Sequence, residues 1–296
     1  MFVIIGLVVV FGAVIGGYLM EHGHIGVLLQ PAELLIIGGA AVGTLLVGNP
    51  PHLLSKIGKG LQSLFGAPRF TKQLYLETLK MFYTLFNHAR KNGLMALEAD
   101  VEEPAKSQIF SKYPSFLKDH HALHFVCDSL RMAVTGAVTP LDLDQMMETD
   151  LDVHHHGEEQ AVSALSTVAD ALPGLGIVAA VLGVVITMGS LGGPPEEIGH
   201  KVAAALVGTF LGILLCYGLL GPLAANMTKR NEEEGAYMTV LRTVLTSFIK
   251  GTTPLLALEI GRRAIPAHVR PTFQELEKTC KSGGAAAPAA APAPSS

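Results

Sequence analysis

The sequence predicts an all-α integral membrane protein with four transmembrane helices in two hairpins and a large helical cytoplasmic domain inserted between the second and third spans. Hydrophobic residues make up 49% of the chain and charged residues only 16%, and the mean hydropathy is +0.42. Soluble domains carry roughly 25% charged residues, so this deficit indicates contact with lipid. The hydrophobic residues gather in four blocks, with the charged residues between them. The chain therefore has a membrane part and a water-exposed part.

The first two hydrophobic blocks form the first predicted hairpin, residues 1–50. Phe2 to Met20 carries no charged residue, and Pro31 to Gly48 carries only Glu33, near its outer end. Each block is long enough to cross a hydrocarbon core of about 30 Å. A cleaved secretory signal peptide is the alternative for the first block, but that block lacks a basic start and a second span follows it closely. We therefore expect two transmembrane helices here.

The last two blocks form the second predicted hairpin, residues 171–227. Ala171 to Leu191 and Val202 to Met227 are the third and fourth spans, and the short segment from Gly192 to Lys201 joins them. Of the 21 Lys and Arg residues, 11 lie from Lys56 to Arg131 and nine lie from Lys229 onward. Because basic residues accumulate on the cytoplasmic side of a membrane, both termini are predicted to be cytoplasmic.

The cytoplasmic regions are expected to be helical. Apolar residues recur at helical spacing in the domain at residues 51–170, and residues 228–281 form a C-terminal helical region with a polar helix around Pro271 to Lys281. Leu53 to Phe65 suits either an interfacial helix or an ordinary amphipathic one. Residues 282–296 are rich in Ala and Pro, and we expect them to be disordered.

Small residues recur every three or four positions in the third and fourth spans, so each set shares one helix face. Such stripes let helices pack closely, and two matching stripes can also line an ion path or hold a partner helix. We assign helix packing to Ala205, Gly208 and Gly212. The residues assigned to an ion path are Gly176, Ala180, Gly183, Thr187 and Thr209, and Ser190 and Cys216 extend the two stripes.

The interiors of the predicted spans contain no carboxylate, lysine or histidine, since Glu33 and Asp170 lie near span ends. Ion relays usually place an ionisable group inside the membrane, so we expect a partner helix to supply the titrating carboxylate. Pro173 and Pro222 lie near the cytoplasmic ends of the third and fourth spans. They are either simple helix boundaries or hinges, and their matching depth favours hinges.

Several other classes of function are not supported. Consecutive histidines on a helix point in different directions, so neither His154 to His156 nor the group His120, His121 and His124 predicts a metal site. The three cysteines have neither paired nor metal-type spacing. No P-loop, GxSxG or HExxH motif is present, and the basic residues form no nucleic-acid patch. We expect a protein that is not an enzyme.

The run from Ala205 to Pro222, ALVGTFLGILLCYGLLGP, resembles the fourth span of the MotA family of flagellar stator proteins. Further stretches support the resemblance: GGYLM at Gly16, QPAELLIIGGA at Gln30, YP at Tyr113, LPGLGIVAAVLGVV at Leu172 and RPTFQELE at Arg270. The resemblance implies a bacterial inner-membrane protein that forms a ring, understood to be pentameric, around a dimer of MotB-type subunits. Those subunits carry the missing aspartate, and ion flow past it drives the ring against the rotor protein FliG.

The resemblance also implies site residues. The loop positions that match the rotor-contact residues are Arg90 and Glu98, with Lys91, Arg69 and Asp150 as weaker candidates; the family usually has glutamate where Asp150 stands. Sodium-type relatives tend to carry a threonine where this chain has Ala180, opposite Thr209. Because alkali cations need several oxygen ligands, we expect protons as the coupling ion and no other cofactor.

Two alternatives remain open at this stage. An energy-transducing subunit of the ExbB or TolQ kind also surrounds a carboxylate helix with small residues, but those relatives have three spans. A solute transporter is less well supported, because no cluster of polar residues suited to a substrate lies at mid-membrane.

Overall fold

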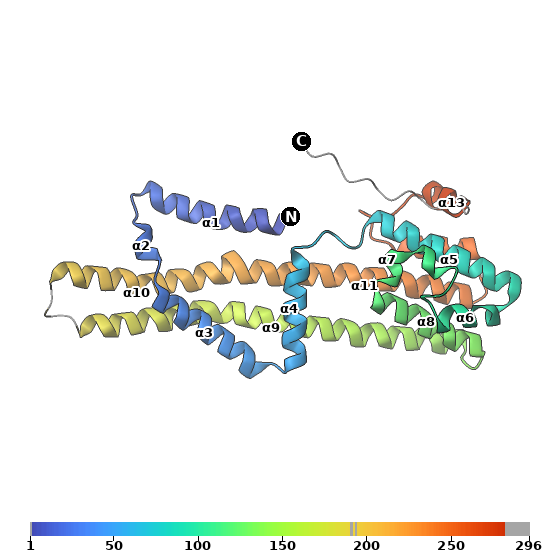
Figure 1. The fold of residues 1–296 in the computed structure, drawn as a ribbon, viewed down its shortest axis with the longest axis horizontal. Helices are drawn as coiled ribbons and strands as arrows, with labels where there is room; N and C mark the ends of the chain where they lie inside the picture. The colour runs from blue at the N-terminus through green and yellow to red at the C-terminus, as the bar shows by residue number, and fades with distance from the viewer. Residues whose placement is uncertain (1, 190–191, 193, 282–296) are drawn as a thin grey trace. The chain divides into compact units, whose positions relative to one another are not determined.

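The computed structural model describes residues 2–189, 192 and 194–281, and these are helices joined by short connections (Figure 1). The predicted disorder of residues 282–296 and the predicted end of the third span at Ser190 and Leu191 lie outside the described residues. The chain forms two compact units. The first contains residues 1–67 and 155–231, and the second contains residues 68–154 and the chain from Glu232 onward.

The first unit holds the apolar helices. Among the described residues, four helical stretches are long and apolar enough to cross a membrane, in agreement with the predicted number of spans. They lie at Phe2–Met20, Ile25–Gly48, within Pro140–Met188 and within Pro195–Ile249. The helices of this unit are α1 (Phe2–Met20), α2 (Ile25–Leu28), α3 (Pro31–Gly48), α4 (Pro51–Leu64), α10 (Pro195–Leu215) and parts of α9 (Pro140–Met188) and α11 (Gly221–Ile249), with a π-helical turn at Cys216–Leu220.

The fourth apolar helix begins earlier than predicted. We expected a connecting segment from Gly192 to Lys201, but α10 starts at Pro195. Proline at the first helical position has its φ angle already fixed for a helix, and its missing N–H removes no helical hydrogen bond. Glu196 and Glu197 in the first turn interact favourably with the helix dipole. Local helix-start signals therefore outweigh the polar composition of this segment.

The amphipathic helix α4 packs on protein in this unit. Its apolar residues Leu53, Ile57 and Leu64 are buried in one cluster with residues of α9 and α11, including Leu165 and Leu223. Lys56 on α4 forms an ion pair of 2.9 Å with Glu158. This packing favours the second of the two predicted roles, an ordinary amphipathic helix.

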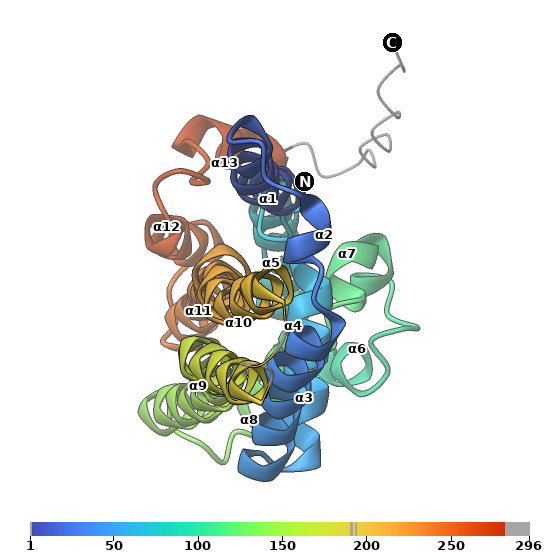
Figure 2. The ribbon, with the colours of Figure 1, turned by 90° about the vertical axis from the view of Figure 1, so that its left-hand side faces the viewer.

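The second unit is a helical domain with one continuous apolar core. Tyr75, Phe82, Phe86, Leu130 and Leu241 are each fully or almost fully buried in it. The helices of this unit are α5 (Lys72–Asn92), η1 (Leu94–Leu97), α6 (Glu98–Glu102), η2 (Phe110–Lys112), α7 (Pro114–Leu117), α8 (His120–Thr135), α12 (Pro254–Ala264) and α13 (Phe273–Lys281), together with the other parts of α9 and α11 (Figures 1 and 2).

Side-chain caps and glycines fix the ends of these helices. The Thr71 hydroxyl accepts a hydrogen bond of 3.3 Å from the N–H of Leu74 at the start of α5, and Asp119 caps α8 in the same way. Gly93 ends α5 with a φ angle of +89°, and Gly136 ends α8 with a φ angle of +64°. Other residues rarely adopt such angles, so glycine sets both ends.

The compact units divide the chain at other points than the predicted boundaries at residues 50, 170 and 227. Helix α4 and residues 155–170 of α9 pack with the apolar helices. Compactness reports packing and does not locate a membrane surface. The predicted division into transmembrane hairpins and cytoplasmic regions therefore stays a prediction about the membrane.

Candidate functional site

Helices α9 and α10 approach each other at their backbones. A Cβ atom added to Gly212 would lie 2.5 Å from the carbonyl oxygen of Leu172 and 2.9 Å from the Cα atom of Gly176. A Cβ atom added to Gly176 would lie 2.7 Å from the carbonyl oxygen of Gly208. Backbone atoms cannot move aside as the end of a long side chain can. Glycine is therefore required at this crossing, as in other small-residue helix contacts in membranes.

The contact between the two helices continues beyond the glycines. A Cβ atom on Gly183 would lie 2.8 Å from that of Ala205, and one on Gly208 would lie 3.1 Å from the N atom of Ala180. Thr187 is buried and donates a hydrogen bond of 2.8 Å to the carbonyl oxygen of Gly183. The two predicted stripes thus face one another within one chain.

Residues assigned to two different roles meet in this contact. Ala205, Gly208 and Gly212 lie where helix packing predicts them. Gly176 and Gly183, which we assigned to an ion path, lie in the same close contact, whereas Thr209 and Ala180 are half-buried. The proposed path would be completed by a partner helix. The ion-path role of Gly176, Ala180, Gly183, Thr187 and Thr209 stays a prediction, and Ser190 lies outside the described residues.

Glu33 is a residue whose importance the sequence reasoning missed. Its side chain is 7% exposed, and its Oε2 atom has no hydrogen-bond partner among the described residues. That atom would lie 2.5 Å from a Cβ atom on Gly208, and Oε1 would lie 3.5 Å from one on Gly183. The carboxylate therefore lies against both small-residue stripes. An ionisable group within an apolar helix is a functional candidate by itself, and this signal was available in the sequence.

The two prolines occupy different local structures. Pro173 lies inside the continuous helix α9. Pro222 is the second residue of α11, directly after the π-helical turn, where the N–H of Gly221 donates to the carbonyl oxygen of Cys216. Proline cannot donate to the carbonyl of the residue four positions earlier and its ring clashes with that group, so the wider turn accommodates Pro222. The hinge role of both prolines stays a prediction.

The predicted rotor-contact charges are exposed on the second unit. Arg90 and Lys91 lie in the last turn of α5, Gly93 ends that helix, and Glu98 opens α6. Arg90 and Glu98 are thus on separate helices. Within the described residues, Arg90, Lys91 and Glu98 form no ion pair. Their charges are available to a partner.

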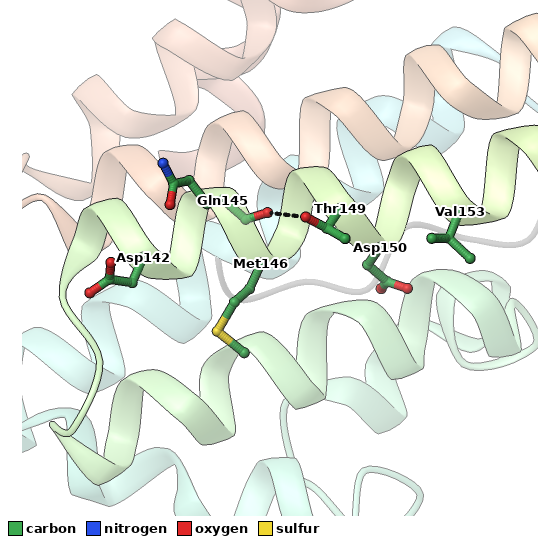
Figure 3. A pocket seen from close by; sticks show the side chains of 6 residues that line it. All are labelled: Asp142, Gln145, Met146, Thr149, Asp150 and Val153. Carbon is green, nitrogen blue, oxygen red and sulfur yellow. Dashed lines mark hydrogen bonds between the residues drawn. The ribbon is translucent and has the colours of Figure 1, made fainter.

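The two other candidates differ from these. Arg69 forms an ion pair of 2.7 Å with the buried Asp119, so its charge is already compensated. Asp150 is exposed on α9 and lines an open pocket (Figure 3). Figure 3 also shows Thr149 beside it, whose hydroxyl donates a hydrogen bond of 2.9 Å to the carbonyl oxygen of Gln145. The residues that line the pocket are Asp142, Gln145, Met146, Thr149, Asp150 and Val153.

An ion pair forms within α12, the helix that packs along α5. Helix α12 packs along α5, and Arg262 on α12 donates hydrogen bonds of 2.6 and 2.7 Å to the two carboxylate oxygens of Glu259. Hydrogen bonding from Arg262 is the main cause that lowers the pKa of Glu259 to about 2. The carboxylate therefore stays ionised at neutral pH and stabilises the last turn of α12, the helix that packs along α5.

Comparisons with known proteins identify relatives over nearly the whole chain. The model for the motility protein A N-terminal region matches residues 4–93, and that for the MotA/TolQ/ExbB proton channel family matches residues 118–239. The chain is 40% identical over 278 residues to motility protein A of Salmonella typhimurium, covering 94% of each protein. It is 36% identical to the chemotaxis protein LafT of Vibrio parahaemolyticus, covering 93% of this chain and 96% of that protein.

Two solved structures are similar in fold. The flagellar MotAB stator complex from Bacillus subtilis has a chain that matches with a TM-score of 0.70 and 23% identity, covering 93% of this chain and 98% of that one. The structure of C. jejuni MotAB matches with a TM-score of 0.72 and 17% identity, covering 89% of this chain and 95% of that one. At these identities the likeness shows the fold alone.

Replacing Gly212 with alanine tests the backbone contact between α9 and α10. We expect Gly212→Ala to lower the free energy of unfolding by about 1–3 kcal/mol, because the added methyl group overlaps backbone atoms. Gly39→Ala is the matched control, since a Cβ atom there meets nothing within 4 Å. Thermal unfolding in detergent can be followed with a thiol-reactive dye, because Cys127, Cys216 and Cys280 are buried. Equal unfolding midpoints for the two variants would show that the helices are not in backbone contact.

Proposed function

This chain belongs to the motility protein A family, and we propose on that premise that it is a stator subunit of a bacterial flagellar motor. In this role it converts ion flow across the membrane into torque on the rotor, and so serves motility and chemotaxis. The observation that carries the proposal is the stretch Ala205 to Pro222, which resembles the fourth span of that family and packs through glycines against α9. The role requires no enzymatic chemistry.

The stator role requires a partner with a titrating group inside the membrane. We propose a MotB-type subunit, whose aspartate would take up and release the coupling ion. The composition of the apolar helices supports this, because Glu33 is the only charged residue within α1 and α3, and the interiors of the third and fourth spans contain no carboxylate, lysine or histidine. Copies of this chain would form a ring around a dimer of the partner, and the family resemblance implies that the ring is a pentamer.

We propose protons as the coupling ion. Ala180 lies beside Gly208 and thus at the level of Thr209, so this level offers one threonine hydroxyl where a sodium-type protein would offer two. A site with fewer oxygen ligands binds an alkali cation less well. Protons need only a carboxylate and a route of water or hydroxyl groups, which the partner and Thr209 can supply.

We propose that exposed charges of the second unit contact the rotor protein FliG. Arg90, Lys91 and Glu98 rank first because they are exposed and form no ion pair among the described residues. Arg69 ranks lower because Asp119 already neutralises its charge, and Asp150 has one methylene less than the glutamate usual in the family. Charges of this kind steer and orient a protein contact more than they add to its affinity.

The proposed location is the bacterial inner membrane, with multiple spans and both termini in the cytoplasm. The distribution of Lys and Arg supports this orientation. An ExbB- or TolQ-like role is the second candidate, because the match at residues 118–239 covers a family shared with those proteins. The match of residues 4–93 to a motility-specific model and the four candidate spans favour the stator role.

Swimming in a host that lacks its own stator genes tests the proposed function. We expect swimming only when this chain and a MotB-type partner are expressed together, with a speed that does not change with sodium at fixed pH and falls to zero with a protonophore. A speed that follows sodium would contradict the proton assignment. A stable complex of both chains that gives no swimming would contradict the stator role and favour the ExbB- or TolQ-like one.

Alanine in place of Pro222 or Pro173 tests the proposed hinges. We expect either variant to abolish swimming while flagella still assemble, because the restored N–H can bond to the preceding turn and stiffen the helix. Pro195→Ala is the control, since Pro195 lies at the start of α10 and is exposed. Flagella counted by electron microscopy separate a motor defect from an assembly defect. Normal swimming in both hinge variants would argue against coupling through these prolines.

Charge reversal at Arg90 and Glu98 tests the proposed rotor contact. Arg90→Glu and Glu98→Lys should each reduce swimming at least several-fold, and a reversed charge on FliG should restore it, because the contact depends on opposite charges. Lys112→Glu is a matched control, since Lys112 is an exposed charge elsewhere in the second unit. If no FliG charge reversal restores swimming, direct charge pairing is not the mechanism.

A further inference from the structure

Two histidines and one glutamate from three different helices meet in the second unit. His121 lies on α8, His154 on α9 and Glu234 on α11, and all three are partly buried. Their metal-ligating atoms all lie within 4.8 Å of one another. The imidazole rings of His121 and His154 are stacked, with centroids 3.6 Å apart and an angle of 17° between the planes. The sequence places these residues far apart, which is why neither histidine group predicted a site.

The Nδ1 atom of His121 lacks a good hydrogen-bond partner. It is buried and has no hydrogen bond among the described residues, and the nearest carboxylate oxygen, Oε1 of Glu234, is 3.4 Å away. This separation is long for a hydrogen bond. It is close to the distance of about 3.3 Å between two ligand atoms that each lie about 2.0–2.1 Å from one tetrahedral zinc ion. The pair is therefore spaced for a shared cation.

The third ligand requires a side-chain rotation. The ligating atoms are at most 4.8 Å apart, so the His154 nitrogen would have to move nearer by at most about 1.5 Å. Because the lone pair of an imidazole nitrogen lies in the ring plane, the same rotation would also have to turn the His154 ring out of its stacked arrangement on His121. His155 and His156 are exposed, and His155 contacts Glu159 on its own helix. Of the three consecutive histidines, only His154 takes part in the cluster, in agreement with the divergent directions expected on a helix.

The local charges suit a divalent cation. Glu234 supplies one negative charge, and neutral imidazoles supply two nitrogen ligands. The nearby cation that could repel a metal is Arg69, but its guanidinium is paired at 2.7 Å with Asp119. The imidazole and carboxylate ligands match the preference of zinc and its first-row neighbours more closely than that of magnesium or calcium.

We propose that His121, His154 and Glu234 form a binding site for a divalent transition-metal ion, with zinc as the best-fitting ion. Three protein ligands leave one tetrahedral position for water or for a ligand from a partner. A bound ion would join α8, α9 and α11 and so stabilise the second unit against local opening. This proposal does not rest on the proposed function, since it concerns metal binding by the chain itself.

Zinc titration of the purified, untagged full-length chain in detergent tests the site. We expect one zinc ion per chain with a dissociation constant in the micromolar range or below, measured by competition with a chromogenic zinc chelator, and a rise of several degrees in the unfolding midpoint that EDTA reverses. Tetrahedral cobalt absorption after substitution would report the ligand geometry. If the chain binds no zinc at a zinc concentration on the order of 100 µM, any site is too weak to be specific, and the proposal is wrong.

Single substitutions assign the ligands. His121→Asn, His154→Asn and Glu234→Gln should each weaken zinc binding at least tenfold and abolish the shift in unfolding midpoint, because each removes one of three ligands. His155→Asn and His156→Asn are matched controls, adjacent to His154 but exposed, and should bind as the unsubstituted chain does. Equal loss in the controls, or unchanged binding in all three ligand variants, would place the zinc elsewhere and refute the site. Circular dichroism before titration shows that each variant is folded.

Discussion

The close backbone contact between α9 and α10 determines how the apolar helices of this protein can be arranged. Lipid tails are as apolar as leucine, so hydrophobic burial does little to hold membrane helices together, and close packing must replace it. Gly176 and Gly212 allow this packing because neither has a Cβ atom to separate the backbones. The same contact leaves room beside Gly208 and Gly183 for the carboxylate of Glu33. A larger residue at any of these glycines would affect both the helix pair and the position of that carboxylate.

Much of the fold could be predicted because its signals are local. The long apolar stretches at Phe2–Met20 and Pro31–Gly48 gave helices with the predicted bounds. The start of α10 at Pro195 was missed because polar composition was given more weight than the proline and acidic residues of the first turn. Periodicity also assumes an unbroken α-helix, so it could not reveal the π-helical turn.

The candidate site was predictable only in part, because some of its contacts join helices that are far apart in the sequence. The small-residue stripes are encoded by spacing along one helix, and the structure places them against each other. By contrast, Glu33 meets Gly208 and Gly183 through contacts between three helices, and His121 meets Glu234 across a separation of more than a hundred positions. Such meetings depend on tertiary packing, which composition and spacing do not specify. The exposed charges at Arg90 and Glu98 were identified through the family resemblance and not through their spacing.

The π-helical turn at Cys216–Leu220 changes the angular position of every side chain that follows it. Each residue of an α-helix advances by about 100°, and a π turn contains roughly one residue more than an α turn, so the later residues are rotated by about that angle relative to an unbroken helix. Leu223, Ala224 and Met227 follow the turn and are buried against Leu53 and Ile57 of α4. Shortening the turn by one residue would direct these side chains away from α4. The extra residue therefore rotates the second part of the helix relative to the first. Before the turn the helix presents its small-residue face to α9, and after the turn it presents an apolar face to α4.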